Sequence, residues 1–302
     1  MRNKFRVVRR LVVLGLVLAV TAIVVPDSVV HNTGMSLVQV NTASAVDHPK
    51  NVIWVLCLGS DARPGQALVG QRADAIQLVG LNLNTHAATD IGIPRDSWVD
   101  IQGAGMNKIN ASMYYGGPQL MAKSVANLVG ITPDYVFTTG FDQFRNMVRI
   151  IGGVRVYSKW AWSDPIRPQG YKVGWNNLNP FQALIFARER HELPAGDFDR
   201  SADQQQLIKS ILRKVRGNID KPGFFERGVY TAAKNLFTDL KPSQLYTLAA
   251  AVASIDPSKI TACVVQGGTG MVGAASVVFP DVAQARAYGN DARADATLNH
   301  GC

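Results

Sequence analysis

The chain has 302 residues, 47% hydrophobic and 18% charged, so it can bury a sizeable core and is not a disordered polypeptide. Its formal net charge of +9 favours an anionic partner. No helix-turn-helix signal, zinc-ligand spacing or basic patch with interleaved aromatic residues accompanies that charge, so nucleic acid is not the expected partner.

The N-terminal segment, MRNKFRVVRR, is basic and contains no acidic residue. The uncharged stretch that follows, 11–25, nearly spans a bilayer as a helix once the valines before it are counted. We therefore expect a cytoplasmic segment at 1–10, a single-pass transmembrane anchor at 11–30 and a linker at 31–49, with the remainder extracytoplasmic in the cell membrane. A cleaved signal peptide stays open as an alternative, because 43–45 (ASA) resembles a cleavage site.

The domain expected at 50–302 alternates strand and helix patterns. This order predicts an α/β fold with a mixed central β-sheet flanked by helices on both faces. Strand patterns, continuous or with period two, occur at 52–58, 75–83, 89–93, 135–139, 154–157, 260–265 and 275–279. Helical patterns occur at 118–128, 141–151, 181–187, 201–215, 224–240 and 243–255. Ser201 and Gln204 have the spacing of a capping box, which favours a helix start at Ser201.

The three cysteines are Cys57, Cys263 and Cys302. None forms a C-x-x-C pair, so a zinc site is not expected. Cys57 lies in an apolar strand pattern and reads as a buried residue, and an exported chain permits disulfides. We predict a bond between Cys263 and Cys302, with a free tail cysteine as the alternative.

Acid–arginine pairs lie at the ends of the first three predicted strands, in the blocks GSDAR (59–63), QRADAI (71–76) and GIPRDS (92–97). Ligands of open α/β sheets collect at strand ends. If the second strand runs antiparallel to its neighbours, all three blocks meet at one rim. An isolated pair of this kind is more often a surface salt bridge, but the repetition at element ends favours a binding site.

Three further arginines, Arg188, Arg190 and Arg200, lie in the block FARERHELPAGDFDRSADQQQ. Guanidinium groups bind phosphate through a planar fork of donors. Positions i and i+2 point apart on a helix and share a face in an extended segment. If Arg188 and Arg190 grip one pyrophosphate, the helix must therefore end at about Arg188, and Glu189 must point away.

These blocks, together with KINASMYYGGP (108–118) and GGVRV (152–156), occur in order over about residues 50–216. They resemble the signature blocks of the LytR-CpsA-Psr family, whose usual topology also includes a basic segment and one apolar helix. The resemblance implies a membrane-anchored phosphotransferase. Such an enzyme would transfer a glycopolymer from a polyprenyl-pyrophosphate carrier to peptidoglycan through a phosphodiester bond.

The resemblance also implies roles for individual residues. Asp61 and Asp74 would hold Mg²⁺, and Arg72, Arg95 and Arg190 would be catalytic. The residues expected to contact the pyrophosphate are Arg63, Arg72, Arg95, Lys108, Arg188, Arg190, Arg200 and Gln204. Two positions depart from the family pattern: Ala73 and Ala75 replace hydroxyl residues on either side of Asp74, and Asp203 replaces an arginine.

Several alternatives remain open at this stage. The same residues would serve a pyrophosphatase acting on polyprenyl or nucleotide pyrophosphates, with water as the acceptor. A non-catalytic, regulatory membrane protein that binds lipid phosphate is a third reading. Asp61 and Asp96 are both candidates for a general base. The polymer is unspecified among arabinogalactan, teichoic acid and capsular polysaccharide, and apolar residues that enclose a prenyl chain look the same as an ordinary core.

Overall fold

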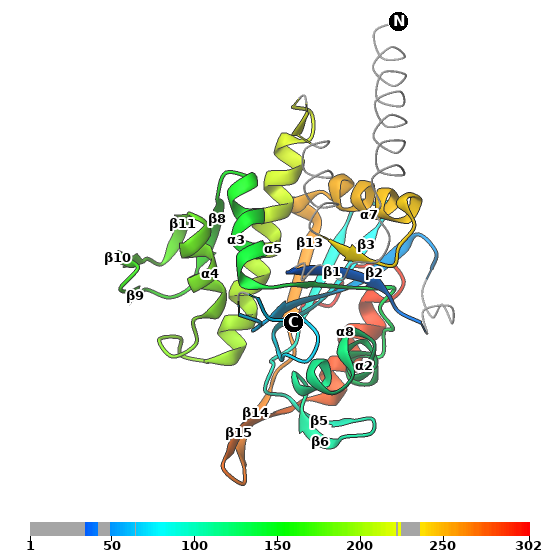
Figure 1. The fold of residues 1–302 in the computed structure, drawn as a ribbon, viewed down its shortest axis with the longest axis vertical. Coiled ribbons are helices and arrows are strands. Elements are labelled where there is room, and N and C mark those ends of the chain that lie inside the picture. Colours follow the sequence, from blue (N-terminus) through cyan, green and yellow to red (C-terminus); the bar gives the residue numbers. More distant parts are fainter. Residues whose placement is uncertain (1–33, 42–48, 64, 222, 225–235) are drawn as a thin grey trace, which may run out of the picture.

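The computed structural model describes residues 34–41, 49–63, 65–221, 223–224 and 236–302 (Figure 1). The basic segment and the anchor predicted at 1–30 lie outside these residues. Within the described ranges, no helix combines the length and the apolar character that a membrane span requires.

A seven-stranded mixed sheet forms the centre of the molecule, in the order β12-β1-β7-β2-β3-β4-β13. The strands are β1 (Met35–Gln39), β2 (Val52–Ser60), β3 (Ala73–Asn82), β4 (Ala88–Gly92), β7 (Tyr135–Thr139), β12 (Phe237–Thr238) and β13 (Ile260–Val264). β3 runs antiparallel to both β2 and β4, whereas β2–β7 and β4–β13 are parallel pairs. The predicted mixed sheet is confirmed, and the blocks at the ends of β2, β3 and β4 meet at one rim.

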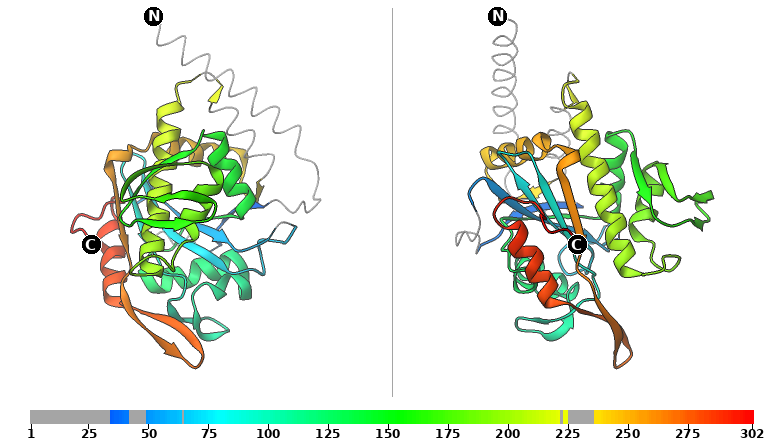
Figure 2. Two further views of the ribbon diagram at one scale, coloured as in Figure 1. Left: turned by 90° about the vertical axis from the view of Figure 1, so that its left-hand side faces the viewer. Right: turned by 180° about the vertical axis from the view of Figure 1, so that it is seen from behind.

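Helices cover both faces of the sheet, as predicted. Because side chains alternate along a strand, Trp54 and Leu56 of β2 pack with α2 (Ala111–Val129) and α8 (Val282–Ala292). Val55 faces the opposite side, where α5 (Asp197–Asn218) and α7 (Pro242–Ser254) lie. The right-hand view of Figure 2 shows α8 and α5 on opposite sides of the sheet.

A smaller layer packs outside α5. It contains α3 (Phe141–Ile150), α4 (Pro180–Arg188) and two hairpins, in which β8 (Val154–Ser158) pairs with β11 (Gly174–Leu178) and β9 (Trp162–Asp164) pairs with β10 (Arg167–Tyr171). Its own core includes the stacked rings of Trp162, Tyr171 and Phe186. Two more hairpins, β5 (Trp98–Ile101) with β6 (Gly105–Lys108) and β14 (Gly267–Val272) with β15 (Ala275–Pro280), extend from the lower end in Figure 1.

Three sequence predictions are wrong. Residues 35–39, expected in the linker, form β1, which acquires its strand character by pairing with β7 and β12. The capping box at Ser201 and Gln204 is absent, because α5 already begins at Asp197, after Gly196 with φ 55°. Asp197 and Asp199 occupy its first turn, where acidic side chains are stabilised by the helix dipole. The helix expected at 224–240 is wrong near its end, where Phe237–Thr238 form strand β12, and 225–235 lie outside the described residues.

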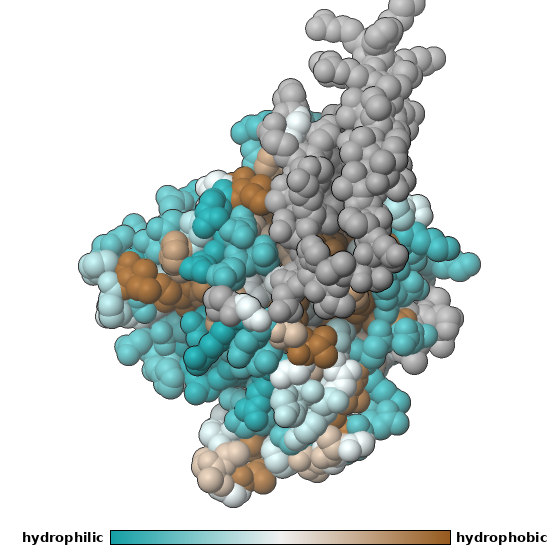
Figure 3. Space-filling view, viewed as in Figure 1, coloured by the Kyte–Doolittle hydropathy of each residue, from teal (hydrophilic) through white to brown (hydrophobic). Residues whose placement is uncertain are grey.

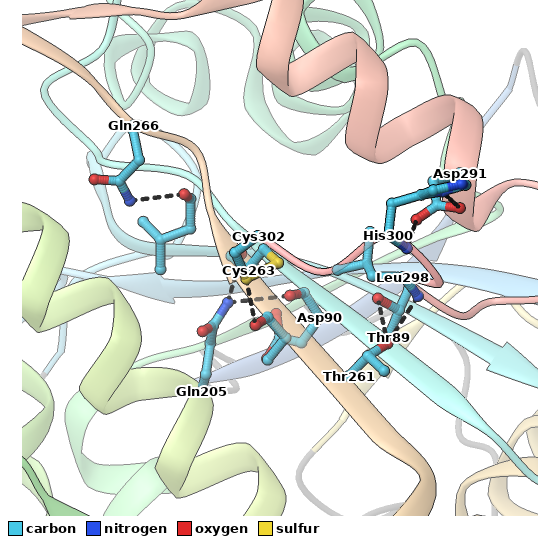
Figure 4. Close-up of a disulfide and its surroundings, with 12 residues drawn as sticks. Thr89, Asp90, Gln205, Thr261, Cys263, Gln266, Asp291, Leu298, His300 and Cys302 are labelled. Atoms are coloured by element: carbon cyan, nitrogen blue, oxygen red, sulfur yellow. Dashed lines mark hydrogen bonds and ion pairs between the residues drawn. A yellow bond between two sulfur atoms is a disulfide. The ribbon is translucent and has the colours of Figure 1, made fainter.

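The predicted disulfide between Cys263 and Cys302 is confirmed, with a Cα–Cα distance of 5.4 Å. It ties the C-terminal tail to β13. Figure 4 shows the bond beside Gln205 of α5, whose amide donates to the backbone carbonyls of Asp90 and Cys263. Cys57 is a free, half-buried thiol.

Candidate active site

The rim of the sheet collects the acidic residues predicted as metal ligands. Asp61 follows β2, and its backbone N–H donates to the Arg72 carbonyl, while the Arg72 N–H donates to the Asp61 carboxylate at 3.0 Å. A shift in the β2–β3 register pairs Gly59 with Ala75 and Ser60 with Ala73. Asp74 is the extra residue between them, so the bulge turns its side chain toward Arg95 at the end of β4.

Arg95 and Asp74 form an ion pair in which each side chain is about one-fifth exposed. Burial lowers the pKa of Arg95, but the carboxylates of Asp74, Asp96 and Asp197 more than compensate, so the net direction is upward. The guanidinium therefore stays charged at the rim and can offer donors to an anion.

The end of α4 has the conformation predicted for two arginines that face one ligand. The helix stops at Arg188, and Glu189 is extended, with φ −63° and ψ 137°. The Glu189 carboxylate accepts the backbone N–H groups of Arg190, His191 and Glu192. Burial raises the pKa of Glu189, but these three hydrogen bonds lower it below its usual range. The carboxylate is thus occupied by the backbone of its own loop. Glu189 was predicted to point away from the phosphate site, but it still lines the cleft described below.

Arg190 and Lys108 share a carboxylate. Lys108 Nζ lies 2.9 Å from one oxygen of Asp96, and Arg190 Nη1 lies 3.5 Å from the other. Asp96 is buried and follows Arg95 directly. This chain links the loop after α4 to the end of β6 across the rim.

Arg200 forms an almost completely buried ion pair with Asp197, one turn earlier on α5. Burial lowers the pKa of Arg200 and raises that of Asp197, while the charge of each partner opposes these shifts. The pair holds a guanidinium at the N-terminal end of α5, where the helix dipole also attracts anions.

Four of the predicted phosphate ligands converge on one polar cleft of about 450 Å³. They are Arg95, Arg188, Arg190 and Arg200, and Asp74 lies beside them. The other predicted residues, which are Asp61, Arg63, Arg72, Lys108 and Gln204, do not line this cleft. The backbone N–H of Arg63 donates to Gln66, and the side chains of Arg63 and Arg72 are exposed.

An apolar cavity of about 380 Å³ adjoins the cleft. It lies between the sheet and helices α3, α4, α5 and α7, and its walls include Leu37, Val55, Phe137, Phe144 and Leu248. Three residues, Asp74, Ala187 and Arg188, line both the cavity and the cleft. The cavity, which we call the tunnel, therefore opens at the arginines. Arg188 stacks on the Phe141 ring, 4.6 Å from its centroid, and makes no ion pair within the described residues.

Gln204 lies on the tunnel wall and not among the arginines. Its amide N–H donates to the carbonyl of Ala187, and its oxygen accepts from Gln77 Nε2 at 3.1 Å. Gln77 also donates to Ser201, so these side chains fasten β3, α5 and the end of α4 together. Sequence reasoning missed Gln77; the signal was an amide in the middle of the apolar run that forms β3.

The carboxylates at the rim fit a cation shared with a substrate better than a closed protein site. No group of three or more His, Cys, Asp or Glu side chains suited to a metal occurs in the described part of the chain. Mg²⁺ commonly uses one or two carboxylates together with phosphate oxygens and water. Asp61, next to Arg72, and Asp74, next to Arg95, are the two carboxylates from which such a site would be built.

Comparison with known proteins places this geometry in a family. The model of the LytR_cpsA_psr family matches residues 26–293. The chain belongs to the LytR-CpsA-Psr family. The polyisoprenyl-teichoic acid–peptidoglycan teichoic acid transferase TagU of Bacillus subtilis is 36% identical over 168 residues, which are 55% of this chain and 53% of that relative. The sequence match thus spans about half the length of the relative.

Solved structures of this family have the same fold. The crystal structure of B. subtilis TagU has a TM-score of 0.59 at 28% identity and covers 78% of this chain and 93% of its own. A LytR-CPS2A-psr family protein, TagT, solved with bound octaprenyl pyrophosphate lipid, has a TM-score of 0.60 at 22% identity. That match covers 81% of this chain and 91% of TagT. The sheet flanked by helices is therefore the fold of the family.

Proposed function

We propose that this protein transfers a glycopolymer from a polyprenyl-pyrophosphate carrier to peptidoglycan and forms a phosphodiester bond. The observation that carries the proposal is the junction at Arg188, where an apolar tunnel meets a cleft with four arginines. A prenyl pyrophosphate has the same two parts, an apolar chain and an anionic head. Octaprenyl pyrophosphate is the ligand of a fold neighbour, and TagU is named for a transfer of this kind.

The tunnel binds the chain by removing apolar surface from water, which contributes roughly 25 cal/mol per Å². The arginines then fix the pyrophosphate at the tunnel mouth. Phosphoryl transfer depends mostly on positioning and on neutralising charge as it develops. Arg188 approaches from the last residue of α4 and Arg190 from the loop after it, while Arg95 follows β4 and Arg200 lies on α5. These different directions surround the two phosphates.

Mg²⁺ is the proposed cofactor, and Asp61 and Asp74 would hold it. When bound, it would neutralise charge on the pyrophosphate. Asp74 lies in the cleft beside Arg95, and Asp61 is hydrogen-bonded to Arg72, two residues before Asp74. Asp96 is buried between Lys108 and Arg190, and its carboxylate would orient these two side chains at the rim.

The proposal includes the location. The segment at 11–30 would anchor the chain in the cell membrane, with the domain outside the cytoplasm beside the lipid carrier and peptidoglycan. The Cys263–Cys302 disulfide supports an oxidising compartment. The teichoic acid named for TagU is one candidate polymer.

A transfer assay tests the proposal. The full-length protein is incubated with a labelled polyprenyl-pyrophosphate-linked glycan and Mg²⁺, with and without peptidoglycan. We expect label on peptidoglycan, and a loss of roughly 10- to 100-fold in Arg190→Ala, because a charge-assisted phosphate contact is removed. Arg149→Ala, at an exposed arginine of α3, is the matched control. Release of free phosphorylated glycan at the same rate in both reactions would instead identify a pyrophosphatase, and no product at all a binding protein.

A further inference from the structure

The block KINASMYYGGP places two exposed tyrosines in the first turn of α2. Tyr114 and Tyr115 are 58% and 52% exposed, although both belong to α2, whose following turns are buried. Val69, in the loop before β3, and Met106, in β6, are also more than half exposed. Figure 3 shows paler and brown colours at the lower end of the molecule, where β5, β6 and the β14–β15 hairpin lie in Figure 1. Exposed apolar groups next to a cleft commonly mark a ligand surface.

A break in α2 holds these rings outward. Gly116 and Gly117 have non-helical conformations, with φ 63° at Gly117, and Pro118 begins the main part of the helix. A Cβ at Gly116 would lie 2.7 Å from the Leu120 side chain, and Gly117 packs against Val69. The first turn is therefore a separate platform, and only glycine permits its geometry.

The platform is attached to the site by backbone hydrogen bonds. The Asn110 carbonyl accepts from the Ala73 N–H, and the Asn110 N–H donates to the Arg95 carbonyl. The Tyr115 hydroxyl accepts from the Asn107 amide at 3.3 Å, and the next residue, Lys108, is bound to Asp96. The first turn of α2 is thus joined to the rim at Ala73 and Arg95, and Tyr115 to the strand that carries Lys108.

We propose that Tyr114 and Tyr115 form a subsite for the glycan strand of the acceptor. This inference rests on the proposed function and deepens it. On the side of α4 and the β9–β10 hairpin, the cleft is lined by Asp164, Ile166 and His191. We assign this side to the glycan of the donor. The opposite wall is left for the acceptor. Tyrosine suits a saccharide, because its ring packs on the C–H face of a sugar and its hydroxyl bonds to sugar hydroxyls.

The test measures the affinity of the full-length protein for two soluble probes. One is a tetrasaccharide of alternating N-acetylglucosamine and N-acetylmuramic acid, and the other is farnesyl pyrophosphate. In the double variant Tyr114→Ala/Tyr115→Ala, we expect the dissociation constant of the tetrasaccharide to rise by roughly tenfold or more. The constant for farnesyl pyrophosphate should stay unchanged, which also shows that the variant is folded. If the pair does not fold, the single variant Tyr114→Ala takes its place.

Tyr246→Ala, at a 40% exposed tyrosine on α7, should change neither constant. Equal tetrasaccharide affinity in wild type and double variant, or no binding by wild type, overturns the subsite. A variant that binds tetrasaccharide normally but loses transfer only from a donor in a bilayer would make this surface a membrane contact, which also overturns the proposal. Tetrasaccharide binding without farnesyl pyrophosphate binding would leave the subsite intact and refute the donor site.

Discussion

The two faces of the central sheet are built from similar apolar residues but are used differently. On the side of α2 and α8, Trp54 and Leu56 are fully buried, and the Trp54 ring lies so close to Gly80 that a Cβ there would approach it to 2.8 Å. On the side of α5 and α7, Val55 and Leu248 border a cavity of about 380 Å³. Closely packed interiors contain few voids larger than a water molecule, so we expect a ligand to fill the open face.

The largest expected difference between the faces is in stability. Leu56→Ala should lower the free energy of unfolding by roughly 2–5 kcal/mol, because it creates a cavity in a filled core. Leu248→Ala should cost no more than about 2 kcal/mol, because this side chain already borders open space. Chemical denaturation of both variants without ligand measures the difference. Equal losses would mean that the tunnel closes in solution.

A second difference between the faces is the effect of pH on stability. Asp90 of β4 is paired with Val79 of β3, so its side chain lies on the α5 side of the sheet. Burial raises its pKa from 3.8 to about 8, and the nearby Gln205 amide opposes this shift only in part. The folded state therefore holds the proton more tightly than the unfolded state. The contribution of the protonated Asp90 to the free energy of unfolding is fully present below about pH 4. It decreases by on the order of a few kcal/mol as the pH rises to about 8.

The variant Asp90→Asn should have a flatter dependence of unfolding free energy on pH between 4 and 8 than the wild type. Part of the slope should remain, because burial also raises the pKa of Asp203 to about 8. Parallel curves for the two proteins would show that Asp90 does not titrate in this range.

The mouth of the tunnel should separate binding from stability. Arg188→Ala should weaken farnesyl pyrophosphate binding by about 1.5–3 kcal/mol, since a charge-assisted contact is lost. Its melting temperature without ligand should stay near that of the wild type, because Arg188 makes no ion pair in the part of the chain described. Calorimetric titration and a thermal melt measure both quantities. A marked loss of stability with unchanged affinity would make Arg188 a structural residue.

The smallest expected effect comes from adding volume to each face. Leu56→Phe should destabilise the fold by about 1–3 kcal/mol, because the filled core cannot accept more atoms. Val55→Phe, at the next position of β2, should be nearly neutral, because its ring enters the tunnel. The second variant should nevertheless lose affinity for farnesyl pyrophosphate and keep that for inorganic pyrophosphate. If both variants are equally destabilised, the faces do not differ in packing.

The sequence predicted the features that depend on local patterns. The apolar run at 52–58 locates β2, and the end of α4 follows from the geometry required of Arg188 and Arg190. The start of α5 was wrong because Ser201 and Gln204 have the spacing of a capping box but make buried tertiary contacts with Gln77 instead. No local pattern distinguishes a capping side chain from a network of this kind.

Features that depend on partners distant in sequence were not predictable. β1 becomes a strand only beside β7 and β12. A tunnel lined by Phe137 and Phe144 has the composition of a core, so only the arrangement of the helices reveals it. At the site, four arginines reach the cleft as expected, whereas the contributions of Asp61, Arg63 and Arg72 stay predictions.

The central claim is that the tunnel and the cleft form one site for a prenyl pyrophosphate. A crystal structure of the protein with farnesyl pyrophosphate and Mg²⁺ tests it most directly. We expect the prenyl chain between β2, β3 and helices α5 and α7, with the pyrophosphate against Arg188 and Arg190. A prenyl chain bound outside the tunnel, or a tunnel closed by α7 with the ligand elsewhere, would contradict it.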